Sequence, residues 1–156
     1  MILMMAGGTN QHNTIAANIV VDLMRHLRRT RCRHCSSDTN IQTACGQSYD
    51  TDAQVDCGPF GPDATASSKP TIVFEVLSAT TRDPDLGIRL PADQATPSIS
   101  QIVYLAPNLT HVMIWTRTAD RWTESVRVRP EESIALDGLA IKMSVAALCE
   151  GAFAAP

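Results

Sequence analysis

The chain has 156 residues, of which 44% are hydrophobic and 19% are charged, and its formal net charge is -3. This length and composition are typical of a globular domain with its own core, so we expect a single domain over residues 1–156. The small net charge excludes a general attraction to polyanions, and no apolar run approaches the roughly 20 residues of a membrane span.

The first residues, MILMMAGG, lack the basic region and long apolar segment of a signal peptide, so we expect a cytoplasmic protein. A helix is predicted next, capped by Thr9 or Asn10 and ending at about Arg29. Its apolar residues recur every four positions, as in a helix that packs one face on a core: Ile15, Ile19, Leu23 and Leu27. His12 lies in the first turn, either as a surface or capping residue or as a catalytic one.

Arginines cluster at the end of this helix and just after it, at positions 25, 28, 29, 31 and 33. One interpretation is contact with phosphates. The other is a solvated face whose charge complements the helix dipole. The sequence leaves both open.

The chain has five cysteines, an odd number, and no export signal, so we expect reduced thiols. The alternative is a zinc site. Cys32 and Cys35 form a CxxC pair that Cys45 and Cys57 could complete, although the second half does not have the spacing of a zinc ribbon.

Residues 39–57 are predicted to form a β-hairpin. A short strand covers Thr39 to Thr43, a turn over Cys45 to Asp50 carries the turn residues 46–48, and the return strand runs from Asp52 to Cys57. Asp52 therefore stands at the beginning of a strand. The next segment, GPFGPDATASSKP, has the composition of a loop.

Residues 71–77, TIVFEVL, form a continuous run of β-forming apolar residues around one acid, Glu75. Such a run is typical of a central strand covered on both faces. Because a lone buried carboxylate is costly, Glu75 is expected to be paired, protonated or bound to a cation. The alternative is a residue at the solvent-exposed end of the strand.

The remainder is predicted to contain one weak helix and several strands. The stretch SATTRDPD can cap a helix at about Asp83, which Pro91 limits. Residues 101–106, 111–117 and 122–129 follow as an antiparallel meander. A short strand near 139–143 and a last turn or short helix over 144–150 complete the chain.

Asp52 and Glu75 lie on strands separated by a loop long enough to let those strands pair. Two carboxylates placed in this way provide the oxygen ligands that a hard divalent cation requires. Magnesium bound by two acids and a backbone carbonyl can polarise a phosphodiester and lower the pKa of an attacking water, as in nucleases. The spacing alone is weak support, because many acid pairs occur in a chain of this length.

Six stretches, in this order and spacing, resemble the Uma-two family of restriction endonucleases, which belongs to the PD-(D/E)xK nuclease superfamily. They are MAGGTNQHNTIAANIVVDLMRHLR, SDTNIQT, YDTDAQVDCG, PTIVFEVLSATTRDPD, PSISQIVYLAP and VMIWTR. The segment EVLSATTRDPD is the most specific, since it matches a family pattern of Glu-Val-Leu-Ser, then Ser/Thr-Thr-Arg, then Asp. The resemblance covers nearly the whole chain and implies a restriction-endonuclease-like α/β/α fold with a mixed central sheet.

The resemblance also implies roles for individual residues. Asp52 and Glu75 would hold one or two magnesium or manganese ions, with the Val76 carbonyl as a third ligand. His12 matches a family histidine in the first helix and is a catalytic candidate. Four further residues match the motif after the strand, where they would shape the site and cap the helix: Ser78, Thr81, Arg82 and Asp85. DNA is the implied substrate, and a homodimer is expected by analogy with nucleases that cut two strands.

The chain departs from the family pattern at the position of the catalytic lysine, where Arg89 stands. Arginine stays protonated and binds phosphate, but it does not readily deprotonate to activate water. The other departures are Thr51 for a proline, an added Pro91, Asp93 for a tyrosine and Gln101 for a glutamate. Family members usually carry a further helix and strands before the MAGGT stretch, so we expect the N-terminal part of the domain to be truncated.

Three functional hypotheses follow. The first is a magnesium-dependent endonuclease that hydrolyses phosphodiester bonds in DNA. The second is a catalytically degenerate family member that acts as a nucleic-acid- or protein-binding module. The third is a zinc-binding module built on Cys32 and Cys35.

Overall fold

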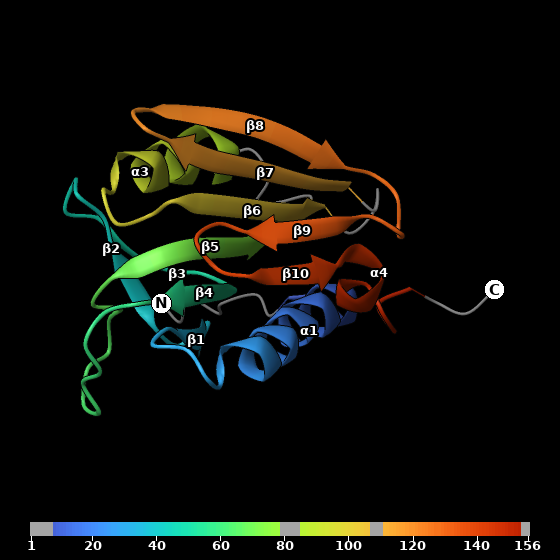
Figure 1. The fold of residues 1–156 in the computed structure, drawn as a ribbon, viewed down its shortest axis with the longest axis horizontal. Coiled ribbons are helices and arrows are strands. Elements are labelled where there is room, and N and C mark those ends of the chain that lie inside the picture. The colour runs from blue at the N-terminus through green and yellow to red at the C-terminus, as the bar shows by residue number, and fades with distance from the viewer. Residues whose placement is uncertain (1–7, 79–84, 107–110, 154–156) are drawn as a thin grey trace, which may run out of the picture.

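The structure, a computed structural model, describes residues 8–78, 85–106 and 111–153 and contains a six-stranded mixed sheet (Figure 1). The spatial order is β1-β4-β5-β6-β7-β8, in which β5 and β6 run parallel and the other neighbours antiparallel. The strands are β1 (Arg33–Ser36), β4 (Ala53–Asp56), β5 (Pro70–Val76), β6 (Gln101–Ala106), β7 (His111–Thr118) and β8 (Arg121–Arg127). This confirms the expected α/β class with a mixed central sheet, including the predicted meander of β6, β7 and β8.

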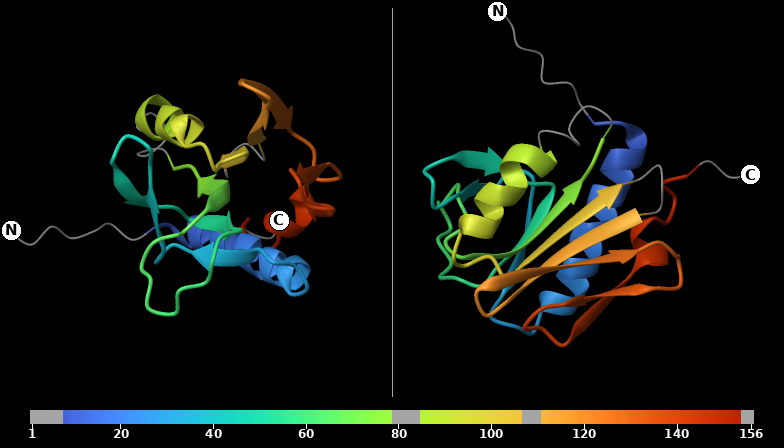
Figure 2. Two further views of the ribbon diagram at one scale, coloured as in Figure 1. Left: turned by 60° about the vertical axis from the view of Figure 1, so that its left-hand side comes forward. Right: turned by 90° about the horizontal axis from the view of Figure 1, so that it is seen from above.

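One face of the sheet is covered by the first helix and the C-terminal elements (Figure 2). These are α1 (Asn10–Leu27), the hairpin of β9 (Ser133–Leu136) and β10 (Ile141–Ser144), and α4 (Val145–Leu148). The predicted start of α1 is confirmed, because the Thr9 hydroxyl accepts a hydrogen bond of 3.2 Å from the His12 N–H. The helix buries the four residues that its period predicted: Ile15, Ile19, Leu23 and Leu27.

The other face carries a smaller layer (Figure 2). It contains the hairpin of β2 (Asn40–Gln42) and β3 (Ser48–Asp50), the π-helical turn η1 (Asp85–Arg89), and α3 (Leu90–Ala95). Pro91 lies in the first turn of α3, where the missing N–H of a proline leaves no hydrogen bond unmade. Glu75 points toward this layer, because it alternates with Val73 and Leu77, which belong to the same apolar cluster. Of the motif residues after β5, Thr81 and Arg82 lie outside the described residues.

The predicted hairpin between residues 39–43 and 52–57 is wrong. β2 pairs with β3, which lies inside the predicted turn, whereas β4 pairs with β1 and β5. Strand β1 was not predicted, since its four residues, RHCS, include no β-branched or aromatic side chain. Its strand conformation depends on pairing with β4 rather than on local preference.

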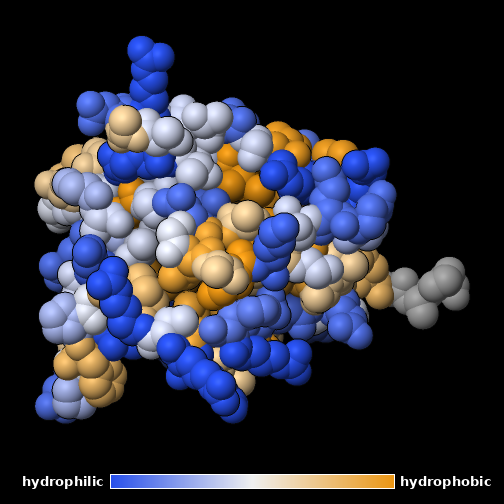
Figure 3. All heavy atoms as spheres, viewed as in Figure 1, coloured by the Kyte–Doolittle hydropathy of each residue, from blue (hydrophilic) through white to orange (hydrophobic). Residues whose placement is uncertain are grey.

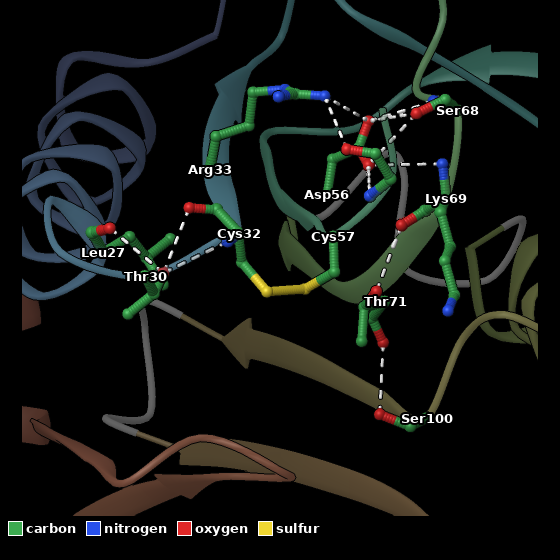
Figure 4. The surroundings of a disulfide bond; sticks show 11 residues. Leu27, Thr30, Cys32, Arg33, Asp56, Cys57, Ser68, Lys69, Thr71 and Ser100 are labelled. Atoms are coloured by element: carbon green, nitrogen blue, oxygen red, sulfur yellow. Dashed lines mark hydrogen bonds and ion pairs between the residues drawn. A yellow bond between two sulfur atoms is a disulfide. The ribbon is translucent and has the colours of Figure 1, made fainter. Parts of the chain in front are cut away.

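The expectation that all five cysteines are reduced is also wrong. Cys32 and Cys57 form a disulfide with a Cα–Cα distance of 4.1 Å (Figure 4). Because Arg33 pairs with Asp56, the antiparallel register places the two cysteines opposite each other at one end of β1 and β4. Cys35, Cys45 and Cys149 are free thiols. The disulfide uses two of the four cysteines of the alternative zinc site, so that set is not formed.

The surface of the face seen in Figure 3 is mostly hydrophilic, with some hydrophobic atoms at its centre. The large hydrophobic residues that are exposed come from several elements, and such scattered exposure is ordinary. Within the described residues, no helix is both long enough and apolar enough to span a membrane.

Asp93 is a buried acid in α3, at the position where the family resemblance expects a tyrosine. Its exposed fraction is 0%, and neither carboxyl oxygen has a hydrogen-bond partner among the described residues. Burial raises the pKa of Asp93 to about 7. The folded state therefore holds a proton on this carboxyl under conditions in which the unfolded chain has released it.

We expect the contribution of Asp93 to the stability to fall as the pH rises from about 4 to about 7 and then to level off, because over this range this carboxyl binds more protons in the folded state than in the unfolded state. The loss attributable to Asp93 is on the order of a few kcal/mol. Urea denaturation across this pH range should show a flatter curve for Asp93→Asn, whereas Asp120→Asn, at an exposed turn, should follow the wild type. Parallel curves for Asp93→Asn and the wild type would contradict this.

Candidate active site

The strand register brings Asp52 and Glu75 together. Ala53 pairs with Phe74 across β4 and β5, so continuing the register by one residue sets Asp52 opposite Glu75. Side chains at directly opposite positions of an antiparallel pair have Cβ atoms about 5 Å apart. Glu75 is only 3% exposed, so the alternative of a residue at the solvent-exposed end of the strand is wrong. The expectation that a buried Glu75 is paired is confirmed by its ion pair with Arg89.

Arg89, at the end of η1, supplies the positive partner of Glu75. Its Nη1 lies 3.1 Å from Glu75 Oε1. Its Nη2 donates to the backbone carbonyl of Asp50, and its Cζ lies 4.5 Å from the centroid of the Tyr49 ring. One guanidinium therefore joins β5 to the end of β3.

Asp52 is held from two other directions. The His12 Nε2 lies 3.1 Å from Asp52 Oδ1, and the Val76 N–H donates a hydrogen bond of 2.7 Å to Asp52 Oδ2. His12 comes from the first turn of α1, so this contact links the helix to the segment that precedes β4. Both carboxylate oxygens of Asp52 have a fixed partner.

These contacts shift two pKa values in directions that favour an ion pair. The hydrogen bond to Asp52 raises the pKa of His12, with burial acting against it. Burial alone would raise the pKa of Asp52, but hydrogen bonds from His12 and Val76 and the charge of His12 outweigh it and lower the value. A hydrogen bond to the Val76 backbone also raises the pKa of His12, because a carbonyl acceptor favours the protonated imidazole.

A cavity of about 170 Å³ lies between these side chains. It is lined by His12, Ser37, Asp50, Thr51, Asp52, Glu75, Val76 and Arg89. All five site residues named from the sequence therefore surround one cavity, while their roles stay predictions. The sequence did not indicate Tyr49 and Asp50, because one contributes a ring face and the other a backbone carbonyl, neither of which leaves a motif.

The oxygen atoms of Asp52, Glu75 and Val76 at this cavity suit a divalent cation in their chemistry. The carboxylates of Asp52 and Glu75 are oxygen donors, the type that Mg²⁺ prefers. In an extended strand the N–H and C=O of one residue point to the same side, so the Val76 carbonyl faces the side of Asp52. Among the described residues no three His, Cys, Asp or Glu side chains form a ligand cluster. The donors fit a hard cation in their chemistry, as two carboxylates completed by a backbone oxygen.

A larger cavity, of about 350 Å³, lies beside the loop between β4 and β5. Its buried acid, Asp56, accepts hydrogen bonds from the backbone N–H groups of Gly58, Ser68 and Lys69 and lies 3.7 Å from Arg33 (Figure 4). Asp56 thus organises the loop. The smaller cavity is the candidate site because it gathers the five residues that the sequence indicated.

The arginine cluster lies away from this cavity. Arg25 is in the last turn of α1, whereas His12 is in the first, about 20 Å apart along the helix axis. Arg25, Arg28, Arg29 and Arg31 are exposed. This position favours the solvated face that complements the helix dipole over phosphate contact at the candidate site.

Comparisons with known proteins agree with this architecture. A family model described as "Uma2: Putative restriction endonuclease" matches residues 1–147. The fold is similar to that of "a putative nuclease belonging to DUF820" from Anabaena variabilis, with a TM-score of 0.77 at 14% sequence identity. That match covers 94% of this chain and 84% of the other, and at this identity it shows the fold alone. No curated protein matches the chain.

We expect the His12–Asp52 pair to stabilise the fold in a pH-dependent way. Its contribution should be full above the ordinary pKa of Asp52, 3.8, and below that of His12, 6.5. It should vanish as the pH rises through the raised pKa of His12. His12→Gln should therefore lower the free energy of unfolding by about 1 kcal/mol at pH about 5, and by less at pH about 9.

Urea denaturation at both pH values would measure this difference. His26→Gln is the matched control, because His26 lies 3.5 Å from Asp22 on the exposed surface of the same helix. An equal loss of stability at the two pH values for His12→Gln would contradict the ion pair.

Proposed function

The chain belongs to the Uma2 family, and from that membership we propose that it is a magnesium-dependent endonuclease that hydrolyses phosphodiester bonds in DNA. The family match agrees with the resemblance found in the sequence, and the nuclease-like fold supports the same function. The observation that carries the proposal is that Asp52, just before β4, and Glu75, on the paired strand β5, line one cavity.

In this proposal Asp52 and Glu75 hold the cation, with the Val76 carbonyl as a third ligand. When bound there, magnesium supplies Lewis-acid polarisation of the scissile phosphodiester and acidifies a bound water. His12 fixes the orientation of the Asp52 carboxylate through its 3.1 Å contact. It also balances part of the negative charge at the cavity.

Arg89 is proposed to bind the substrate phosphate. The guanidinium has five donors in a fork that matches phosphate oxygens, and it stays protonated at neutral pH. It therefore does not act as a general base. An active enzyme with arginine at position 89 must activate water without the lysine that the family pattern has at this position.

One observation favours a second candidate function, a catalytically degenerate family member that binds nucleic acid or protein. The Arg89–Glu75 pair, at 3.1 Å, already places a positive charge at one of the two carboxylates. A protein in which this pair is permanent would keep the fold and its surface but would not cut.

A cytoplasmic location belongs to the same proposal, and the pairing of two chains to cut both strands is proposed by analogy. The Cys32–Cys57 disulfide is unusual for a reducing compartment. Its sulfurs are at the far end of β4 from Asp52, so the proposal does not depend on its oxidation state.

We expect the purified protein to nick supercoiled plasmid in the presence of Mg²⁺ and to lose this activity on addition of EDTA. Glu75→Ala should reduce nicking by about 100-fold or more, as expected when a group that acts in the transition state is removed. Glu124→Ala removes an exposed carboxylate on β8 and should leave the rate unchanged. Gel electrophoresis of the plasmid forms measures the rates.

Equal nicking by the wild type and Glu75→Ala would show that the activity comes from elsewhere. Retained binding of an oligonucleotide without any cleavage would favour the degenerate binding module. Both variants should first be shown to be folded by circular dichroism.

A further inference from the structure

Three groups among the described residues hold the Arg89 guanidinium against the candidate cation site. Nη1 lies 3.1 Å from Glu75 Oε1, Nη2 donates to the Asp50 carbonyl, and the Tyr49 ring lies 4.5 Å from Cζ. The fork of an arginine makes this possible, because it reaches two acceptors at once while its plane lies on an aromatic ring. The guanidinium is therefore a positioned group rather than a loosely attached surface cation.

The same guanidinium neutralises a carboxylate that the strand buries. The Glu75 side chain is 4% exposed and the Arg89 side chain is 25% exposed. Water therefore compensates little of any charge on Glu75, and the guanidinium 3.1 Å from Oε1 supplies the compensating positive charge. At the neighbouring acid, His12 takes the corresponding place on Asp52 Oδ1. The chain thus provides its own positive charge at both carboxylates.

We propose that Arg89 occupies the cation position of the Asp52–Glu75 pair, so that a divalent ion binds Glu75 only when the guanidinium releases it. This inference rests on the proposed function, because it concerns the same carboxylates. Glu75 Oε1 cannot keep Arg89 Nη1 at 3.1 Å and coordinate a metal ion in the same place. Arg89 is then a competitor of the metal, built into the position where the family pattern has lysine.

Charge alone does not account for this competition. A lysine at position 89 would keep the positive charge, but it would lose the fork that reaches the Asp50 carbonyl and most of the stacking on Tyr49. It should therefore hold Glu75 less firmly than arginine does. Arg89→Lys separates the effect of a fixed guanidinium from the effect of a nearby positive charge.

Isothermal titration with Mg²⁺ tests the inference without any measurement of activity. We expect Arg89→Gln to bind Mg²⁺ about tenfold or more tightly than the wild type, since the ion pair between residue 89 and Glu75 no longer has to be broken. Arg89→Lys should lie between the two. Arg121→Gln removes an exposed arginine at the start of β8 and should bind as the wild type does.

Thermal unfolding gives a second readout. A ligand that binds only the folded state raises the melting temperature with its affinity, so Mg²⁺ should stabilise Arg89→Gln more than the wild type. If the loss of charge beside buried Glu75 prevents Arg89→Gln from folding, Arg89→Lys and Tyr49→Leu carry the test. Both keep a positive charge at residue 89 and should still bind Mg²⁺ more tightly than the wild type.

Equal Mg²⁺ affinities for the wild type and the Arg89 variants would overturn the inference. If that shared affinity is lost in Glu75→Ala, the proposed metal site stands and only the role of Arg89 is wrong. Absence of Mg²⁺ binding in the wild type and in every folded Arg89 variant would overturn the inference together with the magnesium-dependent function.

Discussion

The antiparallel register between β4 and β5 is the constraint on which the candidate site depends. It pairs Ala53 with Phe74 and thereby sets Asp52 opposite Glu75. A shift of one residue would turn Glu75 from the layer that contains Arg89 toward the core under α1. The far end of the same strand pair is held by the loop hydrogen bonds of Asp56, and the Cys32–Cys57 disulfide fastens β1 beside it. These contacts tie down the end of the strand pair opposite the site, where the register shifts between Val55 and Asp56.

Asp52 is half-buried and Glu75 is buried, and each has a positively charged partner. The two partners come from the two layers that cover the sheet. His12 comes from α1 on one face of the sheet, whereas Arg89 comes from η1 on the other. The site therefore joins elements that are otherwise separated by the sheet. This arrangement holds the carboxylates in place, and under the proposal above an external cation competes with groups of the chain itself.

The sequence predicted those parts of the fold that have strong local patterns. Strand β5, the meander and α1 follow from apolar runs, alternation and a four-residue period. It did not predict β1, because RHCS has no strand preference, nor the β2–β3 hairpin, because its second strand lies among turn residues. The disulfide also escaped prediction, since two cysteines 25 residues apart become neighbours only through the β1–β4 register.

For the site, the sequence identified the side chains but not the contacts between them. The family pattern indicated Asp52, Glu75 and Arg89, and these residues line one cavity. That Arg89 would pair with Glu75 depends on the π-helical turn η1, which has no clear sequence pattern. The most direct test of a cation site at Asp52 and Glu75 is anomalous diffraction from crystals of Arg89→Gln soaked in Mn²⁺. The account predicts a manganese peak within coordination distance of both carboxylates, whereas the absence of a peak there, with Mn²⁺ bound elsewhere or nowhere, would contradict it.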